Sequence, residues 1–282
     1  MNITIVAGAR PNFIKIAPIL KAIEKARGQG AEIAYRLVHT GQHYDKKMSG
    51  DFFSQLQIPS PDVNLEAGGG TQAEQTANIM VRFEGELIKN RPDMVIVVGD
   101  VTSTMACTIA AKKLCIDVAH VEGGIRSGDR SMPEEINRLV TDSITDYFFT
   151  TSEVANENLR TQGIPESKIF FVGNTMIDTL KAFSDKLIKP EVWKEKELAS
   201  GKYFVLTLHR PANVDDRDKL ESILREIISC ARGYPIVFPV HPRTAKMLDG
   251  LGVSDSNLIL TEPLSYLEFN YLVKNAKAVI TD

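Results

Sequence analysis

Cysteine is scarce in this sequence, with three residues in a chain of 282. None of the three has the spacing of metal ligands, and each lies in an apolar pattern that is typical of a helix. Cysteines of this kind are usually reduced and pack as small hydrophobic residues. The sequence therefore predicts no metal site, and it predicts buried, reduced side chains at Cys107, Cys115 and Cys230.

Long apolar runs, targeting signals and an excess of one charge are also missing. No run is long enough to span a membrane, and the N-terminus leads directly into a predicted strand without a signal peptide. The expected location is therefore the cytoplasm. Lys and Arg number 33 against 36 Asp and Glu, giving a net charge of -3. This balance gives no reason to expect nucleic acid or an anionic membrane as a partner.

The composition that remains is that of a soluble globular protein, with 43% hydrophobic and 24% charged residues. Short apolar strands alternate with helical patterns, which predicts an α/β protein whose parallel sheets are covered on both faces. The expected strands cover residues 2–7, 33–38, 62–65, 94–98, 117–121, 147–150, 169–174, 203–208, 236–240, 258–260 and 278–281.

The length and a polar segment favour two domains. The segment from Lys189 to Gly201 contains Pro190 and the only tryptophan, after which the alternation restarts. We predict an N-terminal domain over residues 1–174, a helix and linker over 175–201, and a second domain over 202–282. Because the second range holds few strands and stops at a strand end, we expect that domain to be incomplete.

Polar residues follow many of the predicted strands, and ligands of open parallel sheets bind at the carboxyl ends of the strands. Four of the five histidines fall at these ends, and the fifth, His120, lies within a strand. A single histidine there is usually structural, but the repetition favours function. The residues in these positions are Arg10, His39, His43, Asp100, Glu122, His209, Arg210, His241 and Arg243.

The first strand ends in Gly8-Ala9-Arg10-Pro11, a candidate phosphate site because a helix N-terminus offers amide N–H groups and a positive dipole. It lacks the spacing of a dinucleotide site and of a P-loop. A tight turn with a salt-bridging arginine is an equal alternative. Spacing alone predicts a solvated charge at Lys15.

Residues 120–138 contain the densest chemistry of the chain, with four carboxylates and three arginines around one strand-to-helix turn. Glu134 and Glu135 follow Pro133, where a helix dipole stabilises carboxylates, so helix-start electrostatics is the plain interpretation. Asp100 is either a helix cap or a buried group prepared for proton transfer. Together with Glu122 and Glu134, it would supply three acid–base groups whose like charges push their pKa values apart.

These stretches together resemble the non-hydrolysing UDP-N-acetylglucosamine 2-epimerases, and the matching segments run in order through the chain. One departure is Gly123, where the family usually has alanine. The segments are residues 8–15, 40–43, 98–100, 120–129, 132–138, 173–175, 208–214 and 241–243.

The resemblance implies two Rossmann-like doubly wound domains in the GT-B arrangement. It implies reversible conversion of UDP-N-acetylglucosamine to UDP-N-acetylmannosamine, by anti elimination of UDP through 2-acetamidoglucal and re-addition, to supply sugars for surface polysaccharide. A homodimer is expected, and neither NAD nor a metal is implied.

The resemblance also assigns roles by position. Asp100, Glu122 and Glu134 would be the acid–base carboxylates, with His209 as a further catalytic residue. His209 and Arg10 would contact the diphosphate, and Lys15 and Arg138 would support the charged site. A second, activating UDP-N-acetylglucosamine would be held by Gln42, His43, Arg210 and His241. In the family, a Ser-Gly-Gly turn and a downstream glutamate follow the position of Asp282, and this sequence contains neither.

Three alternatives remain open. A hydrolysing epimerase would release free N-acetylmannosamine. A GT-B glycosyltransferase would share the architecture but would not need three carboxylates in the first domain. A catalytically incomplete fragment that only binds a nucleotide sugar is the third.

Overall fold

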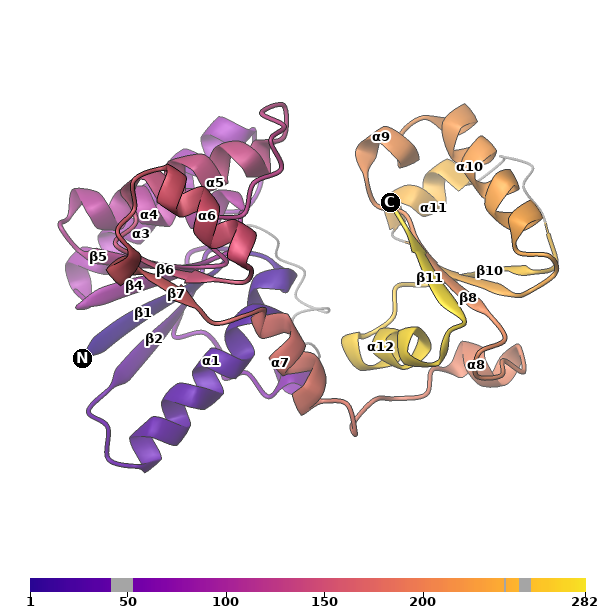
Figure 1. The fold of residues 1–282 in the computed structure, drawn as a ribbon, viewed down its shortest axis with the longest axis horizontal. Coiled ribbons are helices and arrows are strands. Elements are labelled where there is room, and N and C mark those ends of the chain that lie inside the picture. Colours follow the sequence, from indigo (N-terminus) through magenta and orange to yellow (C-terminus); the bar gives the residue numbers. More distant parts are fainter. Residues whose placement is uncertain (42–52, 241, 249–254) are drawn as a thin grey trace. The chain divides into compact units, whose positions relative to one another are not determined.

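The chain folds into two compact units, Met1–Ala182 and Phe183–Asp282 (Figure 1). The computed structural model describes residues 1–41, 53–240, 242–248 and 255–282. Each unit contains one sheet, and all the strand pairings are parallel. The α/β class with two Rossmann-like sheets is thus confirmed. The segment 175–201, predicted as a separate helix and linker, is divided between the two units.

The first sheet has seven strands in the order β3-β2-β1-β4-β5-β6-β7. The order reverses between β1 and β4, which makes this pair the switch point of a doubly wound sheet. The strands are β1 (Asn2–Ala7), β2 (Ala34–His39), β3 (Val63–Asn64), β4 (Met94–Val98), β5 (Asp117–Val121), β6 (Tyr147–Thr150) and β7 (Ile169–Phe171).

Helices cover both faces of this sheet, as Figure 1 shows. On one face lie α1 (Arg10–Gly28) and α7 (Thr175–Ala182), and on the other lie α3 (Gln72–Lys89), α4 (Thr102–Lys113), α5 (Pro133–Ile144) and α6 (Glu153–Thr161). The short helix η1 (Glu166–Lys168) precedes β7. The capping box predicted at Thr71 and Glu74 is present: the Thr71 hydroxyl accepts the Glu74 N–H at 3.2 Å.

The central strands are buried because helices pack on both sides of them. In β4 and β5 every residue except the first is buried, which agrees with the continuous apolar sequence of β4 and the mostly apolar sequence of β5. Phe83 of α3 and Ala106 of α4 belong to the core on one face. This packing fixes the ends of β1, β4 and β5, where the candidate site lies.

The second unit contains four strands in the order β10-β9-β8-β11, so its switch point is the β8–β11 pair. Leu220 and Leu224 of α10 pack on one face of the sheet, and Trp193 and Leu272 pack on the other. The elements are α8 (Glu191–Glu195), β8 (Phe204–Thr207), α9 (Pro211–Val214), α10 (Arg217–Cys230), β9 (Ile236–Pro239), α11 (Pro242–Leu248), β10 (Leu258–Thr261), α12 (Tyr266–Asn275) and β11 (Ala278–Thr281).

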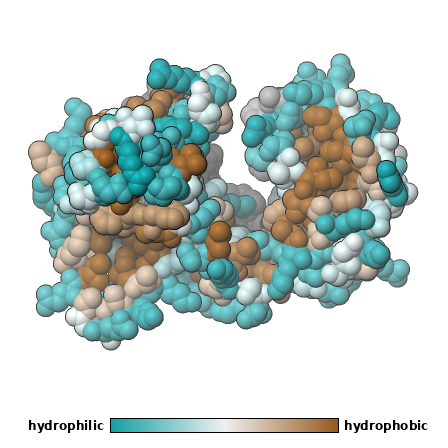
Figure 2. Space-filling model, viewed as in Figure 1, coloured by the Kyte–Doolittle hydropathy of each residue, from teal (hydrophilic) through white to brown (hydrophobic). Residues whose placement is uncertain are grey.

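Some apolar side chains reach the surface. On the second unit a groove is lined by Phe204, Ile227, Cys230 and Ile280, and Figure 2 shows apolar surface on this unit. In the part of the chain that the structure describes, no helix is long and apolar enough to cross a membrane.

The prediction of three buried cysteines is correct for Cys107 alone. Burial raises the pKa of its thiol well above the ordinary value. Cys115 is exposed because α4 ends at Lys113, and Cys115 lies in the following turn with a φ of 54°. Cys230 is exposed at the last position of α10.

Candidate active site

The turn between β1 and α1 is tied to the end of β4 by one side chain. The amide oxygen of Asn12 accepts the N–H groups of Gly8 at 3.1 Å and Ala9 at 2.9 Å. Its amide nitrogen donates to the Val98 carbonyl at 3.0 Å. Two of the amides expected to cradle a phosphate are therefore used within the turn. Arg10 is exposed at the first position of α1.

Asp100 is held by two consecutive residues of α5. Its carboxylate pairs with the Arg138 guanidinium, and its carbonyl oxygen accepts a hydrogen bond from the Asn137 amide at 2.8 Å. Asp100 is not a helix cap, because the N-cap of α4 is Val101 and makes no side-chain capping bond. The carboxylate is thus oriented by the helix that also carries Glu134.

Glu122 follows β5 in a left-handed conformation with a φ of 75°. This conformation costs a residue other than glycine about 1 kcal/mol or more, and it is often found at functional sites. The Glu122 carboxylate lies 2.5 Å from Lys15 Nζ. The prediction of a solvated Lys15 is wrong: its exposure is 7%, because it lies on the face of α1 that packs over Gly99.

The two carboxylates lie at neighbouring positions of the sheet edge. Strands β4 and β5 pair in register at Val98 and Val121, and the Gly99 N–H donates to the Val121 carbonyl at 3.0 Å. Asp100 directly follows Gly99, and Glu122 directly follows Val121. One has its cation on α5 and the other on α1, so the cations come from helices on opposite faces of the sheet. Each carboxylate thus has its own cation partner next to the switch point.

The two glutamates at the start of α5 have different environments. Glu135 is buried and accepts hydrogen bonds from the Ser127 N–H at 2.9 Å, the Ser127 hydroxyl at 3.0 Å and Arg138 at 3.1 Å. Burial raises the pKa of Glu135, but these hydrogen bonds outweigh it and hold that pKa below the ordinary value. Glu134 is partly buried and makes no hydrogen bond or ion pair with any residue that the structure describes. It lies one helical turn before Arg138, on the same face of α5.

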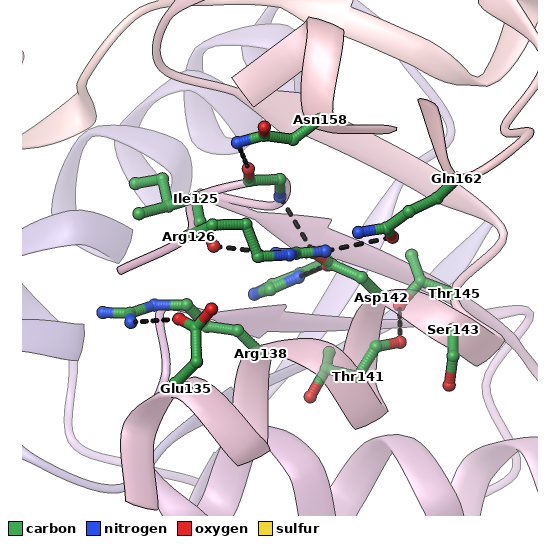
Figure 3. Close-up of polar contacts among 12 residues, drawn as sticks. Ile125, Arg126, Glu135, Arg138, Thr141, Asp142, Ser143, Thr145, Asn158 and Gln162 are labelled. Carbon is green, nitrogen blue, oxygen red and sulfur yellow. Dashed lines mark hydrogen bonds and ion pairs between the residues drawn. The ribbon is translucent and has the colours of Figure 1, made fainter. Parts of the chain in front are cut away.

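An ionic cluster built on the fully buried His120 and Asp142 lies behind these residues. Asp142 of α5 pairs with Arg126 at 2.6 Å, and Figure 3 shows these two side chains pointing toward each other with Gln162 beside the guanidinium. His120 Nδ1 lies 2.6 Å from the Asp142 carboxylate, and the Gly124 N–H donates a hydrogen bond to the same carboxylate at 3.0 Å. Burial alone would raise the pKa of Asp142, but His120 and Arg126 lower it below the ordinary value.

In the second unit, Asp282 organises the residues that follow β8. Its carboxylate accepts the N–H groups of His209 and Arg210, and it lies 2.9 Å from His209 Nδ1. Asn213 adds a hydrogen bond at 3.1 Å. Burial raises the pKa of Asp282, but these donors outweigh it and lower that pKa. The His209 side chain is 71% exposed, so its Nε2 edge can meet a ligand at the β8–β11 switch point.

The neutral histidine at the end of β2 should give the first unit a pH-dependent stability. His39 is buried, its Nδ1 accepts the Gly41 N–H at 2.8 Å, and burial lowers its pKa to about 4. The unfolded chain takes up this proton near pH 6.5, so stability is complete above pH 6.5 and falls as the pH drops toward 4.

Between pH 7 and pH 5, the free energy of unfolding should fall by roughly 2 kcal/mol more in the wild type than in His39→Asn. Asparagine keeps an acceptor for the Gly41 N–H but does not titrate. Urea denaturation at the two pH values measures the difference. Equal pH dependence in both proteins would contradict this account of His39.

The sequence profile of UDP-N-acetylglucosamine 2-epimerase matches residues 25–282. The chain belongs to the UDP-N-acetylglucosamine 2-epimerase family. The resemblance stated from its sequence motifs is therefore confirmed.

Individual relatives of this epimerase-family chain are similar over its whole length. A UDP-N-acetylglucosamine 2-epimerase from Methanocaldococcus jannaschii is 42% identical over 292 residues, with 100% of this chain and 78% of the relative covered. The crystal structure of that enzyme with UDP-GlcNAc and UDP has a TM-score of 0.88, at 41% identity, with 100% of this chain and 79% of the other covered. A UDP-2,3-diacetamido-2,3-dideoxy-D-glucuronate 2-epimerase from Pseudomonas aeruginosa is 40% identical over 286 residues, with 100% and 78% covered.

The epimerase-family residues predicted from the sequence are found in three settings. Lys15, Asp100, Glu122 and Arg138 form two ion pairs at the edge of the first sheet, with Glu134 on the adjoining helix. His209 and Arg210 follow β8 in the second unit. Gln42, His43 and His241 lie outside the described residues, so their predicted role stays a prediction.

Three residues of this epimerase-family chain escaped the sequence analysis as contributors to the geometry around the predicted residues. Asn12 ties the first turn to β4, Asp142 anchors the buried cluster, and Asp282 holds the His209 segment. A signal existed for Asp142, because a histidine in the middle of a buried strand needs a polar partner. Glu135 was interpreted as helix-start electrostatics, whereas it is a buried acceptor for the preceding loop.

Proposed function

We propose that this chain catalyses the reversible epimerisation of UDP-N-acetylglucosamine to UDP-N-acetylmannosamine at C2. The observation that carries the proposal is the pair of carboxylates, Asp100 and Glu122, at adjacent strand ends beside the β1–β4 switch point. Membership of the epimerase family supports it, as does the M. jannaschii enzyme whose structure contains UDP-GlcNAc and UDP.

The reaction needs acid–base groups at C2 and cations at the diphosphate. The C2 proton is barely acidic, so its removal has to be coupled to the departure of UDP from C1. The C2–H and C1–O bonds break, and a C1–C2 double bond forms in 2-acetamidoglucal. UDP then adds back at C1, and C2 receives a proton on the opposite face. One group must therefore accept a proton on one side of C2 and another must donate on the other.

The carboxylates of the first unit are proposed for these proton transfers. Asp100 and Glu122 each have a cation partner that orients the carboxylate, and a carboxylate can accept a proton. Glu134 has no such partner among the described residues, which suits a group that holds a proton in one step and releases it in the next. Lys15 and Arg138 hold their carboxylates in place.

The diphosphate is proposed to bind His209 and Arg10. Asp282 engages Nδ1 of His209 and leaves Nε2 exposed; a ring with hydrogens on both nitrogens would donate from Nε2 to a phosphate oxygen. Negative charge grows on UDP as it leaves, so a donor at that oxygen lowers the barrier. Gln42, His43, Arg210 and His241 are proposed to hold a second, activating UDP-N-acetylglucosamine.

Reaction in deuterium oxide tests this proposal. We expect deuterium at C2 of both the product and the recovered substrate, without any acceptor sugar, and UDP-N-acetylmannosamine as the product by NMR. Free N-acetylmannosamine would instead indicate the hydrolysing reaction. Absence of C2 exchange in the intact protein would overturn the proposal and favour a module that only binds a nucleotide sugar.

A second candidate substrate comes from the P. aeruginosa relative, which is named for epimerisation of UDP-2,3-diacetamido-2,3-dideoxy-D-glucuronate. Its identity to this chain, 40%, is close to the 42% of the M. jannaschii enzyme. The C2 chemistry is the same for both sugars. The ratio of kcat/KM for the two substrates decides between them, and we expect UDP-N-acetylglucosamine to be preferred.

Three further properties belong to the same proposal. The active form is proposed to be a homodimer in the cytoplasm that supplies N-acetylmannosamine-type sugars for surface polysaccharide. Light scattering of the purified protein checks the dimer, since it measures mass independently of shape.

A further inference from the structure

The buried histidine of β5 contacts two groups that can accept a hydrogen bond but, in their ordinary state, cannot donate one. His120 Nε2 lies 2.8 Å from the carbonyl oxygen of Gly99, and His120 Nδ1 lies 2.6 Å from Asp142 Oδ1. A carbonyl has no hydrogen, so Nε2 must carry one. Whether Nδ1 also carries one depends on the state of Asp142.

The surroundings of Asp142 keep it a carboxylate. Its second oxygen lies 2.6 Å from Arg126 and accepts the Gly124 N–H at 3.0 Å. These are donors, and a protonated acid would lose part of their stabilisation. The ionised state means that Nδ1 of His120 donates as well. Both ring nitrogens are then protonated, and the ring is an imidazolium with no exposure to solvent.

This imidazolium holds the backbone immediately before Asp100. The Gly99 carbonyl accepts from His120, while the Gly99 N–H donates to the Val121 carbonyl at 3.0 Å. Gly99 has a φ of 70°, so it has already left the strand conformation. The next side chain is the Asp100 carboxylate. One ring thus joins helix α5, which carries Glu134, to the turn that carries Asp100.

We propose that His120 is a doubly protonated, buried positioning residue that fixes the spacing between the Asp100 turn and helix α5. The inference rests on the proposed function, because the spacing matters only if these carboxylates handle the C2 proton. His120 itself does not touch the substrate, since it is fully buried behind Gly99. Its effect should therefore be on kcat rather than on substrate binding.

Nitrogen-15 NMR of the histidine-labelled, intact wild-type protein tests the protonation state directly. We expect both ring nitrogens of His120 to show directly bonded hydrogens at neutral pH, with the resonance assigned by its loss in His120→Gln. A ring nitrogen without hydrogen would overturn the proposal. This result does not depend on activity, so it stands even if the proposed reaction is wrong.

Asp142→Asn tests the role of the carboxylate that holds His120 Nδ1. The amide has one acceptor oxygen, so it cannot serve His120, Arg126 and Gly124 together. We expect His120 to lose its Nδ1 hydrogen, and kcat to fall about 10- to 100-fold with KM within about threefold, as a small misplacement of a reacting group predicts.

The matched control is Asp146→Asn. Asp146 also pairs a cation, Lys112 at 2.6 Å, and accepts a β5 backbone N–H, that of Val118 at 2.8 Å, but at the opposite end of the strand. We expect Asp146→Asn to keep kcat and KM. Equal kcat in Asp142→Asn and wild type would contradict the positioning role.

Two substitutions of His120 distinguish its contact with the Gly99 carbonyl from its contact with Asp142. The amide of glutamine in His120→Gln can reach the place of Nε2 and donate to Gly99, whereas the shorter amide in His120→Asn can reach only the place of Nδ1. We expect the glutamine variant to retain at least tenfold more kcat than the asparagine variant. Equal kcat values would overturn the role of the Gly99 contact. If both variants fail to fold, NMR of the wild type decides the protonation state and Asp142→Asn the kinetic role.

Failure of this inference differs from failure of the proposed function. A wild-type protein without C2 exchange contradicts the epimerase proposal, whatever the state of His120. An active wild type whose His120 has one unprotonated nitrogen contradicts this inference alone.

Discussion

Replacing Glu122 with glutamine should lower kcat for epimerisation by roughly 100- to 10,000-fold, the range expected when an acid–base group is lost. The amide cannot accept the C2 proton, and it leaves the buried Lys15 ammonium without its counter-charge at 2.5 Å. Rates of C2 deuterium exchange and of product formation measure the effect. Exchange should fall together with turnover, because both require proton transfer at C2.

Glu197→Gln is the matched control for this substitution. Glu197 is also a glutamate in the left-handed region, with a φ of 48°, but it is exposed and lies in the second unit. We expect its kcat to equal that of the wild type. A Glu122→Gln protein that folds and keeps kcat within threefold of the wild type would remove Glu122 from the proposed proton transfers.

Replacing Gly124 with alanine should lower the free energy of unfolding by about 3 kcal/mol. Gly124 has a φ of 81°, and an added Cβ would lie 2.4 Å from the Ala155 carbonyl oxygen. That oxygen belongs to the backbone of α6, so the helix itself would have to move. Urea denaturation measures the loss.

Gly128→Ala separates backbone strain from this clash. Gly128 has a φ of 75°, but an added Cβ would have no atom within 4 Å. We therefore expect the strain alone, about 1 kcal/mol. Equal losses in Gly124→Ala and Gly128→Ala would show that α6 can move away without cost, against this interpretation.

The location of Asp100 and Glu122 at the same edge of the sheet could be predicted from the sequence for a physical reason. Strand β4 has a continuous apolar sequence and β5 is mostly apolar, as strands buried on both faces require, and their observed bounds equal the predicted ones. Parallel neighbouring strands end at the same edge. The residues that follow them must therefore be close in space.

The burial of Lys15 could not be predicted in this way. Helical periodicity identifies which residues of α1 face the sheet, but it does not say where along the helix the sheet ends. Lys15 lies over Gly99, at the level where β4 has just ended, so its ammonium meets the turn and reaches Glu122. A charge on the inner face of a helix is tolerated only at such an edge.

Polar contacts between residues far apart in the sequence could not be predicted either. Asp142 is 22 residues from His120, and in the sequence it looks like part of the polar face of α5. Only the packing of α5 on the sheet shows that this face is buried. The register between a helix and a strand depends on side-chain packing along both elements, and a local pattern does not contain that information.

The four donors gathered by Asp282 set an order of events on the ribosome. His209 leaves the exit tunnel 73 residues before its acceptor. At a synthesis rate of about 5 to 20 residues per second, the segment after β8 waits for several seconds before β11 arrives beside it. The segment that carries His209 and Arg210 therefore cannot adopt its final conformation at the time when β8 is synthesised. It becomes ordered only after β11 has been synthesised and inserted next to β8.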